Sequence, residues 1–319
     1  MTSRIPHLLE PHLSLPPESS LITLTSVLGA STNWLVLRHL HALLKPAPSP
    51  HNQQQQHQAH QNSHQAAGDE GEVAVLLVSF LRDLPFWREN LSRLGIDLDA
   101  AGRRGRFGFV DGLSGGGGGG GLFSVPGVGG LGGQQQQRKV RQGWEGVLGN
   151  AAPGEIGRVV LEGVERLRRS SSTTSSAAAE RRVVLVIDGL DFVLAALDPS
   201  LGLGQSLQGG GDAPGTAIAT KEMLMELREK THAVIITLAA DDPLIKEQET
   251  TLEKQHAWFA LSLAHEADMV TSLRLLDTGT AKDVSGVIRI THREARVKDH
   301  EYLYHVGGDG GVRVFERGQ

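Results

Sequence analysis

The sequence predicts a three-layer α/β domain whose central sheet is mainly parallel and gains antiparallel strands towards the C-terminus. Apolar runs such as residues 73–78 and 183–187 lack polar alternation, which is typical of strands buried on both faces of a parallel sheet. Strand-like runs alternate with segments of helical spacing, as right-handed crossovers in a layered domain require. Beyond residue 268 only short strand-like runs follow. They favour an antiparallel edge over an ordinary doubly wound nucleotide-binding fold.

Each expected strand in the first part of the chain is followed by an expected helix. Residues 21–28 (LITLTSVL) are rich in strand-forming residues, and apolar residues then recur at helical spacing. Gly95 stands where the second helix should stop. The strand and helix pairs are 21–28 with 32–44, 73–80 with 84–94, 106–110 with 156–167, 183–187 with 216–230, and 233–238 with 252–265. The closing strands are 269–276, 286–292, 302–305 and 312–315, with a glycine turn at 307–311.

Four low-complexity segments interrupt this pattern and hold roughly a quarter of the 319 residues. They lie at about 46–72, 112–137, 168–182 and 199–215. Their Gly, Gln, Ser and Pro content offers too few apolar groups to offset the entropy of ordering them. We therefore interpret them as loop expansions within one domain that spans residues 1–319.

The composition excludes several kinds of chemistry. The chain has no cysteine, which excludes disulfide scaffolds, thiol nucleophiles, iron–sulfur clusters and cysteine-ligated zinc. Lys and Arg number 31 against 36 Asp and Glu, a net charge of −5 that argues against a nucleic-acid binder with a basic surface all round. The N-terminus has no apolar signal-peptide core, and no run reaches the ~20 apolar residues of a membrane helix. We expect a soluble intracellular protein with no membrane partner and no metal site.

The turn after the first strand stands where a phosphate-binding loop would lie. Such a loop reads G-x-x-x-x-G-K-[ST], and its Lys and hydroxyl group serve the phosphates and the magnesium ion. Here residues 26–33 keep only Gly29, at an interior position, and Ser31 replaces the second glycine. Thr32 replaces the Lys, Asn33 replaces the hydroxyl residue, and no Gly-Lys dipeptide occurs in the chain. We interpret this as a degenerate phosphate loop in which Ser31 or Thr32 caps the helix.

Asp188 follows the apolar run 183–187 and resembles the magnesium-holding Asp of a Walker B strand. Many buried strands also end in Asp, and Asp188 with Gly189 would form a good turn. Without a phosphate loop this Asp has no metal-nucleotide to hold, so a structural role is favoured. Asp83, near the end of the second strand, is expected to cap the helix that follows.

Two loops at the same sheet edge are the places where a nucleic acid could bind. The first, residues 198–215, has no Lys or Arg. The second, residues 241–255, has Lys246 and Lys254 among five carboxylates, so these lysines are weak candidates for RNA contacts.

Three segments carry a family resemblance: residues 78–98 (VSFLRDLPFWRENLSRLGIDL), 188–192 (DGLDF) and 265–276 (HEADMVTSLRLL). Together they resemble the sixth subunit of the Elongator complex in its filamentous-fungal form. The first segment is the specific one, whereas the other two occur widely in RecA-like proteins. The resemblance covers the patterned chain from about residue 21 to 315 and skips the low-complexity segments.

This resemblance implies a RecA-like fold without the usual ATPase motifs. It implies a hetero-hexameric ring with the fourth and fifth Elongator subunits, two copies of each. The ring binds tRNA and, with the remaining Elongator subunits, supports modification of the wobble uridine. We therefore predict a non-catalytic structural subunit, not an enzyme, that has no cofactor and is located in the cytoplasm and nucleus.

Two other functions stay open at this point. The first is an active ATPase with an unconventional phosphate loop, for which Arg38 and Arg82 are the nearest basic residues. The second is a RecA-type regulator of DNA recombination. It would need a basic channel loop, which residues 241–255 do not supply.

Overall fold

A computed structural model describes residues 5–45, 72–113, 144–169, 180–198, 215–276, 281, 283–294 and 297–316. Within these ranges a ten-stranded sheet has the order β10-β9-β8-β7-β1-β6-β5-β2-β3-β4. The strands are β1 (Ser20–Ser26), β2 (Val73–Ser79), β3 (Phe107–Asp111), β4 (Trp144–Val147), β5 (Arg182–Asp188), β6 (Ala233–Ala239), β7 (Met269–Arg274), β8 (Gly286–His292), β9 (His300–Val306) and β10 (Val312–Phe315). Neighbours from β7 to β4 pair in parallel, and β8, β9 and β10 add on as antiparallel strands. The predicted fold class is thereby confirmed.

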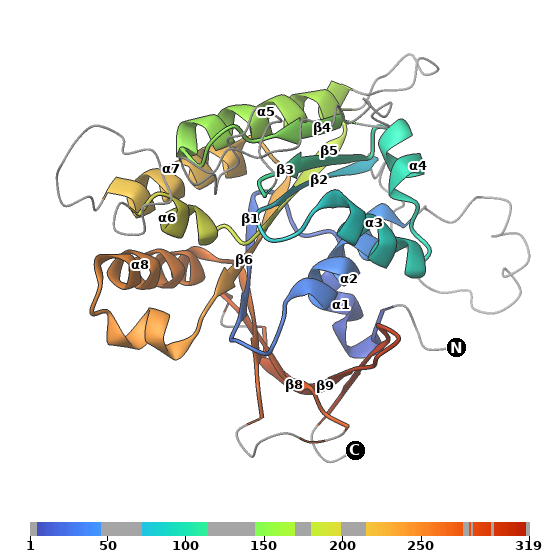
Figure 1. The fold of residues 1–319 in the computed structure, drawn as a ribbon. Helices are drawn as coiled ribbons and strands as arrows, with labels where there is room; N and C mark the ends of the chain where they lie inside the picture. Colours follow the sequence, from blue (N-terminus) through green and yellow to red (C-terminus); the bar gives the residue numbers. More distant parts are fainter. Residues whose placement is uncertain are drawn as a thin grey trace, which may run out of the picture.

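Helices cover both faces of the sheet (Figure 1). On one face lie η1 (His7–Leu9), α1 (Glu10–Leu13), α2 (Asn33–Leu44), α3 (Leu84–Arg93) and α4 (Leu98–Arg103). On the other lie α5 (Pro153–Arg169), α6 (Phe192–Ala196), α7 (Gly215–Glu229) and α8 (Thr251–Glu266). Successive residues of β2 enter different cores: Leu76 packs under the second group and Leu77 under the first. Such burial on both faces is what the unbroken apolar runs predict.

The strand order brings the expected site residues to one edge of the sheet. β6 lies between β1 and β5, so the carboxyl ends of β1 and β5 are two strand spacings apart, roughly 10 Å. β2 follows β5, which places it three strands from β1. The turn after β1 and Asp188 at the end of β5 therefore share this edge.

Several local signals are confirmed. The Asp83 carboxylate accepts the Phe86 N–H at 3.0 Å and so caps α3. Gly95 follows the end of α3 with a φ of 84°, a conformation that glycine adopts at low cost. Trp34 and Trp87 stand at helical spacing among aliphatic residues, which predicts core packing, and both are buried.

The sequence does not predict β4, because this strand forms through packing contacts and has no periodic apolar pattern. Its Trp144 ring covers Gly163 of α5, where an added Cβ would stand only 2.4 Å from a ring carbon. Gly108 of β3 also lies beside this ring. A four-residue strand that contains Gly146 carries no alternating pattern to reveal it. The short helices α4 and α6 and the π-helical turn η4 (Pro243–Glu247) were missed for the same reason.

The margins of two expected inserts also belong to regular structure. α5 continues to Arg169 and β5 begins at Arg182, inside the segment expected at 168–182. α7 begins at Gly215, the last residue of the segment expected at 199–215. The interiors of all four segments lie outside the described residues.

Candidate functional site

The turn between β1 and α2 is the place where a phosphate loop would bind a nucleotide. Gly29 adopts a φ of 90°, and the Ala30 N–H bonds back to the Val27 carbonyl at 2.9 Å. The Ser31 hydroxyl accepts the Asn33 N–H at 3.2 Å, so this serine caps the first turn of α2. Thr32 occupies the N-cap position, but its side chain makes no capping bond. These contacts close the turn on itself.

A carboxylate already binds a backbone amide of this turn. Oδ1 of Asp241, from the loop after β6, accepts the Leu28 N–H at 2.7 Å. Backbone amides at this position are the groups that would otherwise attract a phosphate. The carboxylate occupies the amide and brings a negative charge that repels a phosphate. From the sequence, Asp241 is only one of several acids in a loop, and nothing there indicates this contact with residue 28.

Asp188 is fully buried and serves as a link between strands. Its Oδ2 accepts the Ser79 hydroxyl of β2 at 2.9 Å, and its Oδ1 accepts the Thr237 hydroxyl of β6 at 3.2 Å. Burial raises the pKa of the Asp188 carboxyl, while the hydrogen bonds from these two hydroxyls act in the opposite direction. The carboxylate thus connects the ends of β2, β5 and β6 with its oxygens turned inward.

A second acid, partly buried, lies beside it, and no sequence motif above singles it out. Asp191 accepts the Ala239 N–H at 3.0 Å, and the His256 ring nitrogen Nδ1 lies 4.0 Å from its carboxylate. The other ring nitrogen of His256 is 2.9 Å from the Ala239 carbonyl. Burial raises the pKa of the Asp191 carboxyl above its usual range. The Asp-x-x-Asp spacing at the strand end is the signal that could have found it.

The nearest arginines do not substitute for the absent lysine. Arg38 is buried in α2 and donates to the Gly310 carbonyl at 3.2 Å, in the β9–β10 turn. Arg82 follows β2, three strands from β1, and its guanidinium carbon lies 5.3 Å from the centre of the Phe86 ring. Neither brings its charge to the Gly29 turn.

The weak RNA-contact candidates do not form a basic surface. Lys246 lies in η4 and forms an exposed ion pair with Asp242 at 2.8 Å. Lys254 is exposed on the first turn of α8, beside the capping carboxylate Glu253. The two lysines are therefore set among acids.

Leucines stand exposed where the strands leave this edge. Leu28 after β1 is 86% exposed, and Leu275 after β7 lies within 3.5 Å of the Cβ position of Gly29. Leu81 after β2 and Leu113 after β3 are also exposed. We call these four residues the leucine rim.

The part of the chain that the structure describes holds neither a metal-binding cluster nor a membrane-spanning helix. No group of three or more His, Asp or Glu side chains in that part is arranged to hold a metal ion. None of the helices there combines the length and hydropathy needed to cross a lipid bilayer.

The geometry defines a RecA-like domain, and comparison with solved structures agrees. A KaiC-like protein from the hyperthermophilic archaeon Pyrococcus horikoshii matches with a TM-score of 0.51, over 98% of this chain and 97% of that one. The sequence identity is 15%, so the likeness establishes the fold alone. No family model matches this sequence, and no curated protein matches it.

Proposed function

We propose that this chain is a non-catalytic assembly subunit of a ring of RecA-like proteins. By the resemblance of residues 78–98, that ring is the hetero-hexamer of the Elongator complex with the fourth and fifth subunits. In this proposal the ring binds tRNA and supports modification of the wobble uridine. The subunit contributes surfaces and not a nucleotide site.

The contact between Asp241 and the Leu28 N–H is the observation that carries the non-catalytic part. An ATPase of this fold needs free amides and a lysine in the turn, and here an acid binds the amide. Asp188 adds to the argument, because both of its oxygens accept hydroxyl groups within the sheet. Those two hydroxyl groups occupy one lone pair on each oxygen, in the interior of the sheet.

The leucine rim supports the assembly part. The exposed leucines form two pairs along one sheet edge, one after β1 and β7 and one after β2 and β3, and exposed apolar groups of this kind are available for protein contacts. Because the chain is acidic and its lysines there lie among carboxylates, tRNA affinity would arise mainly from the partner subunits.

Native mass spectrometry of the complex purified from its own organism tests the assembly. The expected result is a six-chain ring with two copies of this chain and two copies each of two other RecA-like proteins. Recovery of the chain as a monomer, or with unrelated partners only, would refute the proposal.

Isothermal titration of the purified chain with Mg-ATP tests the non-catalytic role. We expect no saturable binding and no hydrolysis. If the chain alone hydrolysed ATP, and Asp188→Ala abolished that activity while leaving the chain folded, the active-ATPase alternative would be correct.

A further inference from the structure

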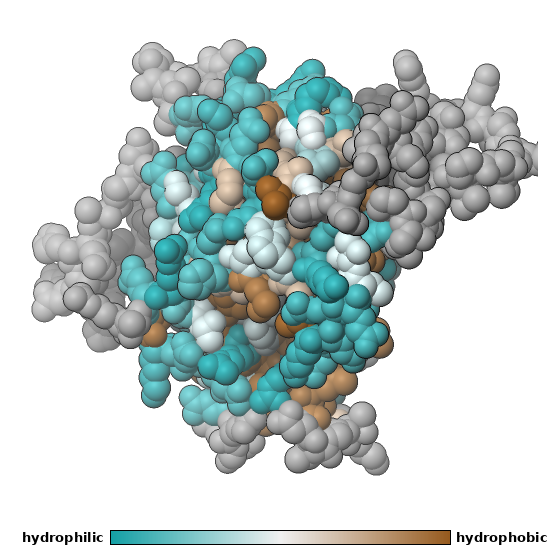
Figure 2. Space-filling model, turned by 90° about the vertical axis from the view of Figure 1, so that its left-hand side faces the viewer, coloured by the Kyte–Doolittle hydropathy of each residue, from teal (hydrophilic) through white to brown (hydrophobic). Residues whose placement is uncertain are grey.

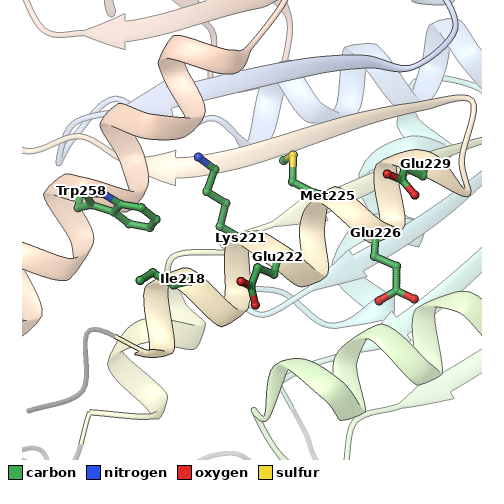
Figure 3. Close-up of a pocket in the computed structure, with 7 residues that line it drawn as sticks. All are labelled: Ile218, Lys221, Glu222, Met225, Glu226, Glu229 and Trp258. Carbon is green, nitrogen blue, oxygen red and sulfur yellow. The ribbon is translucent and has the colours of Figure 1, made fainter.

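A groove of about 430 Å³ lies between α7 and α8, away from the leucine rim (Figure 3). Ile218 and Trp258 form its apolar end, and they are 41% and 43% exposed. Leu261, one turn after Trp258 on α8, is 54% exposed. α6, α7 and α8 lie at the left of Figure 1, and Figure 2 shows the molecule from that side. Separate brown hydrophobic patches are visible there among teal hydrophilic residues.

Helix geometry explains why these side chains face outward. α7 buries Leu224 and Leu227 against the sheet, and the opposite stripe carries Ile218, Glu222, Met225 and Glu229 at spacings of four, three and four residues. α8 likewise buries Phe259 and Leu263 and leaves Trp258 outside. Trp258 keeps 43% of its surface exposed, and this apolar area is available for another molecule to cover.

Lys221 holds the tryptophan in place. Its Nζ lies 5.4 Å from the centre of the Trp258 ring and pairs with Glu266 of α8 at 2.5 Å. In Figure 3 the indole of Trp258 and the Lys221 side chain lie next to each other across the two helices. The aromatic end of the groove is therefore preorganised.

The glutamates of α7 lack the ion pairs with arginine that neutralise the glutamates of α5. On α5, Glu155, Glu162 and Glu165 each pair with an arginine of the same helix. On α7, the exposed Glu222, Glu226 and Glu229 form no ion pair with any residue that the structure describes. The nearby cations of α7 are engaged elsewhere: Lys221 with Glu266, and Arg228 with Asp268.

We propose that this groove binds a cationic amphipathic helix of a partner protein. Lys or Arg side chains at successive turns of that helix would face Glu222, Glu226 and Glu229, and its aliphatic side chains would cover Trp258, Ile218 and Met225. RNA is disfavoured as an occupant because three uncompensated carboxylates repel phosphates. Residues 199–214, which precede α7, contain no Lys or Arg and so lack the required charge. This inference does not depend on membership of a ring.

The probe is a fluorescein-labelled helical peptide of 18 residues or so, with Lys facing one side and Leu the other, measured by anisotropy against the full chain in low salt. We expect saturable binding that the triple variant Glu222→Lys, Glu226→Lys and Glu229→Lys weakens by about tenfold or more. Trp258→Ala should weaken it by a similar factor. The same peptide with Glu in place of every Lys should not bind.

A matched control separates groove contacts from net charge. Glu10, Glu294 and Glu316 are exposed on other elements, and their conversion to Lys changes the net charge by the same amount. This control variant should bind the cationic peptide within about twofold of the wild type. Circular dichroism verifies that each variant is folded.

Three outcomes would overturn the proposal. The first is failure of the wild type to bind the cationic peptide, and the second is equal loss in the groove and control variants. The third is self-association of the wild type in sedimentation that the groove variant abolishes, because the occupant would then be a second copy. The native-mass experiment is independent of all three, so failure here leaves the ring proposal standing.

Discussion

Two regions at the carboxyl edge of the parallel strands are stabilised in opposite ways. At the end of β5, Asp188 is fully buried and bound by hydroxyls of two neighbouring strands. At the end of β1, the Gly29 turn is exposed, and an acid from another loop binds its Leu28 amide. The end of β5 is thus part of the core, whereas the turn after β1 is part of the surface.

This difference determines how freely each region can change without loss of the fold. The buried acid cannot be exchanged freely, because two hydroxyl groups would be left without an acceptor. The exposed turn has no such constraint and can change towards protein contacts. Sequence motifs alone show both regions as incomplete, and only the structure shows that one is a buried, hydrogen-bonded acid and the other an exposed turn.

The largest expected effect is that of Asp188→Ala on stability. Removing the carboxylate leaves the Ser79 and Thr237 hydroxyls without an acceptor in the core, although each still accepts a backbone N–H, at a cost of about 3 kcal/mol in the free energy of unfolding measured in urea. Asp188→Asn keeps one acceptor and should cost less. The matched control is Asp111→Ala, at the less buried end of β3, with a loss below about 1 kcal/mol. Equal losses for Asp188→Ala and Asp111→Ala would show that Asp188 does not link the strands.

The second prediction concerns α2, which is buried along almost its whole length, in contrast to the exposed Gly29 turn that precedes it. His39 in its middle is fully buried with an unpartnered Nδ1, and burial lowers the pKa of this imidazole to about 4. The unfolded chain, with a His pKa near 6.5, therefore binds a proton that the folded chain does not. Stability should fall as pH drops from about 6.5 to 4, by about 3 kcal/mol from this group.

The test is urea unfolding at several pH values within that window. His39→Leu, which needs no hydrogen bond, should remove the contribution of this group to the slope. Burial of His12 acts in the same direction, whereas the raised pKa values of the Asp188 and Asp191 carboxyls act in the opposite direction in wild type and variant alike. His265→Gln at the exposed end of α8 is the control and should keep the wild-type slope. An unchanged slope in His39→Leu would contradict the buried neutral state of this histidine.

The sequence is sufficient for the parallel core but not for the contacts that decide function. Unbroken apolar runs identify β2 and β5, because burial on both faces leaves a composition signal within one segment. The contact between Asp241 and Leu28 joins residues 213 positions apart, and no local pattern encodes it. The packing of Trp144 on Gly163 is likewise a fit between two elements. Local periodicity therefore predicts elements, whereas the state of the candidate site depends on tertiary contacts.

A third prediction separates two effects on ATP binding at the turn after β1: the carboxylate of Asp241 and the absence of a lysine at position 32. Asp241→Ala loses one hydrogen bond in an exposed turn, which should cost about 1 kcal/mol or less and should not by itself create ATP binding. Thr32→Lys combined with Asp241→Ala should bind Mg-ATP about tenfold more tightly than Thr32→Lys alone, because the amide is then free. Asp242→Ala, next along the loop, is the control and should add no such gain. If the Asp241 and Asp242 variants behaved alike, the contact with Leu28 would not be what blocks the turn.

The smallest effect on stability, and the sharpest on assembly, is expected for Leu28→Asp. Because this side chain is 86% exposed, its replacement should change the free energy of unfolding by no more than about 0.5 kcal/mol. If the leucine rim contacts a neighbouring subunit, however, a carboxylate placed there would be buried without a partner on assembly. We expect co-purification of the two other ring proteins to fall strongly in this variant. Val297→Asp introduces the same charge at an exposed apolar residue elsewhere and should leave the assembly intact. Intact rings with Leu28→Asp would show that the exposed turn after β1 makes no contact in the assembly.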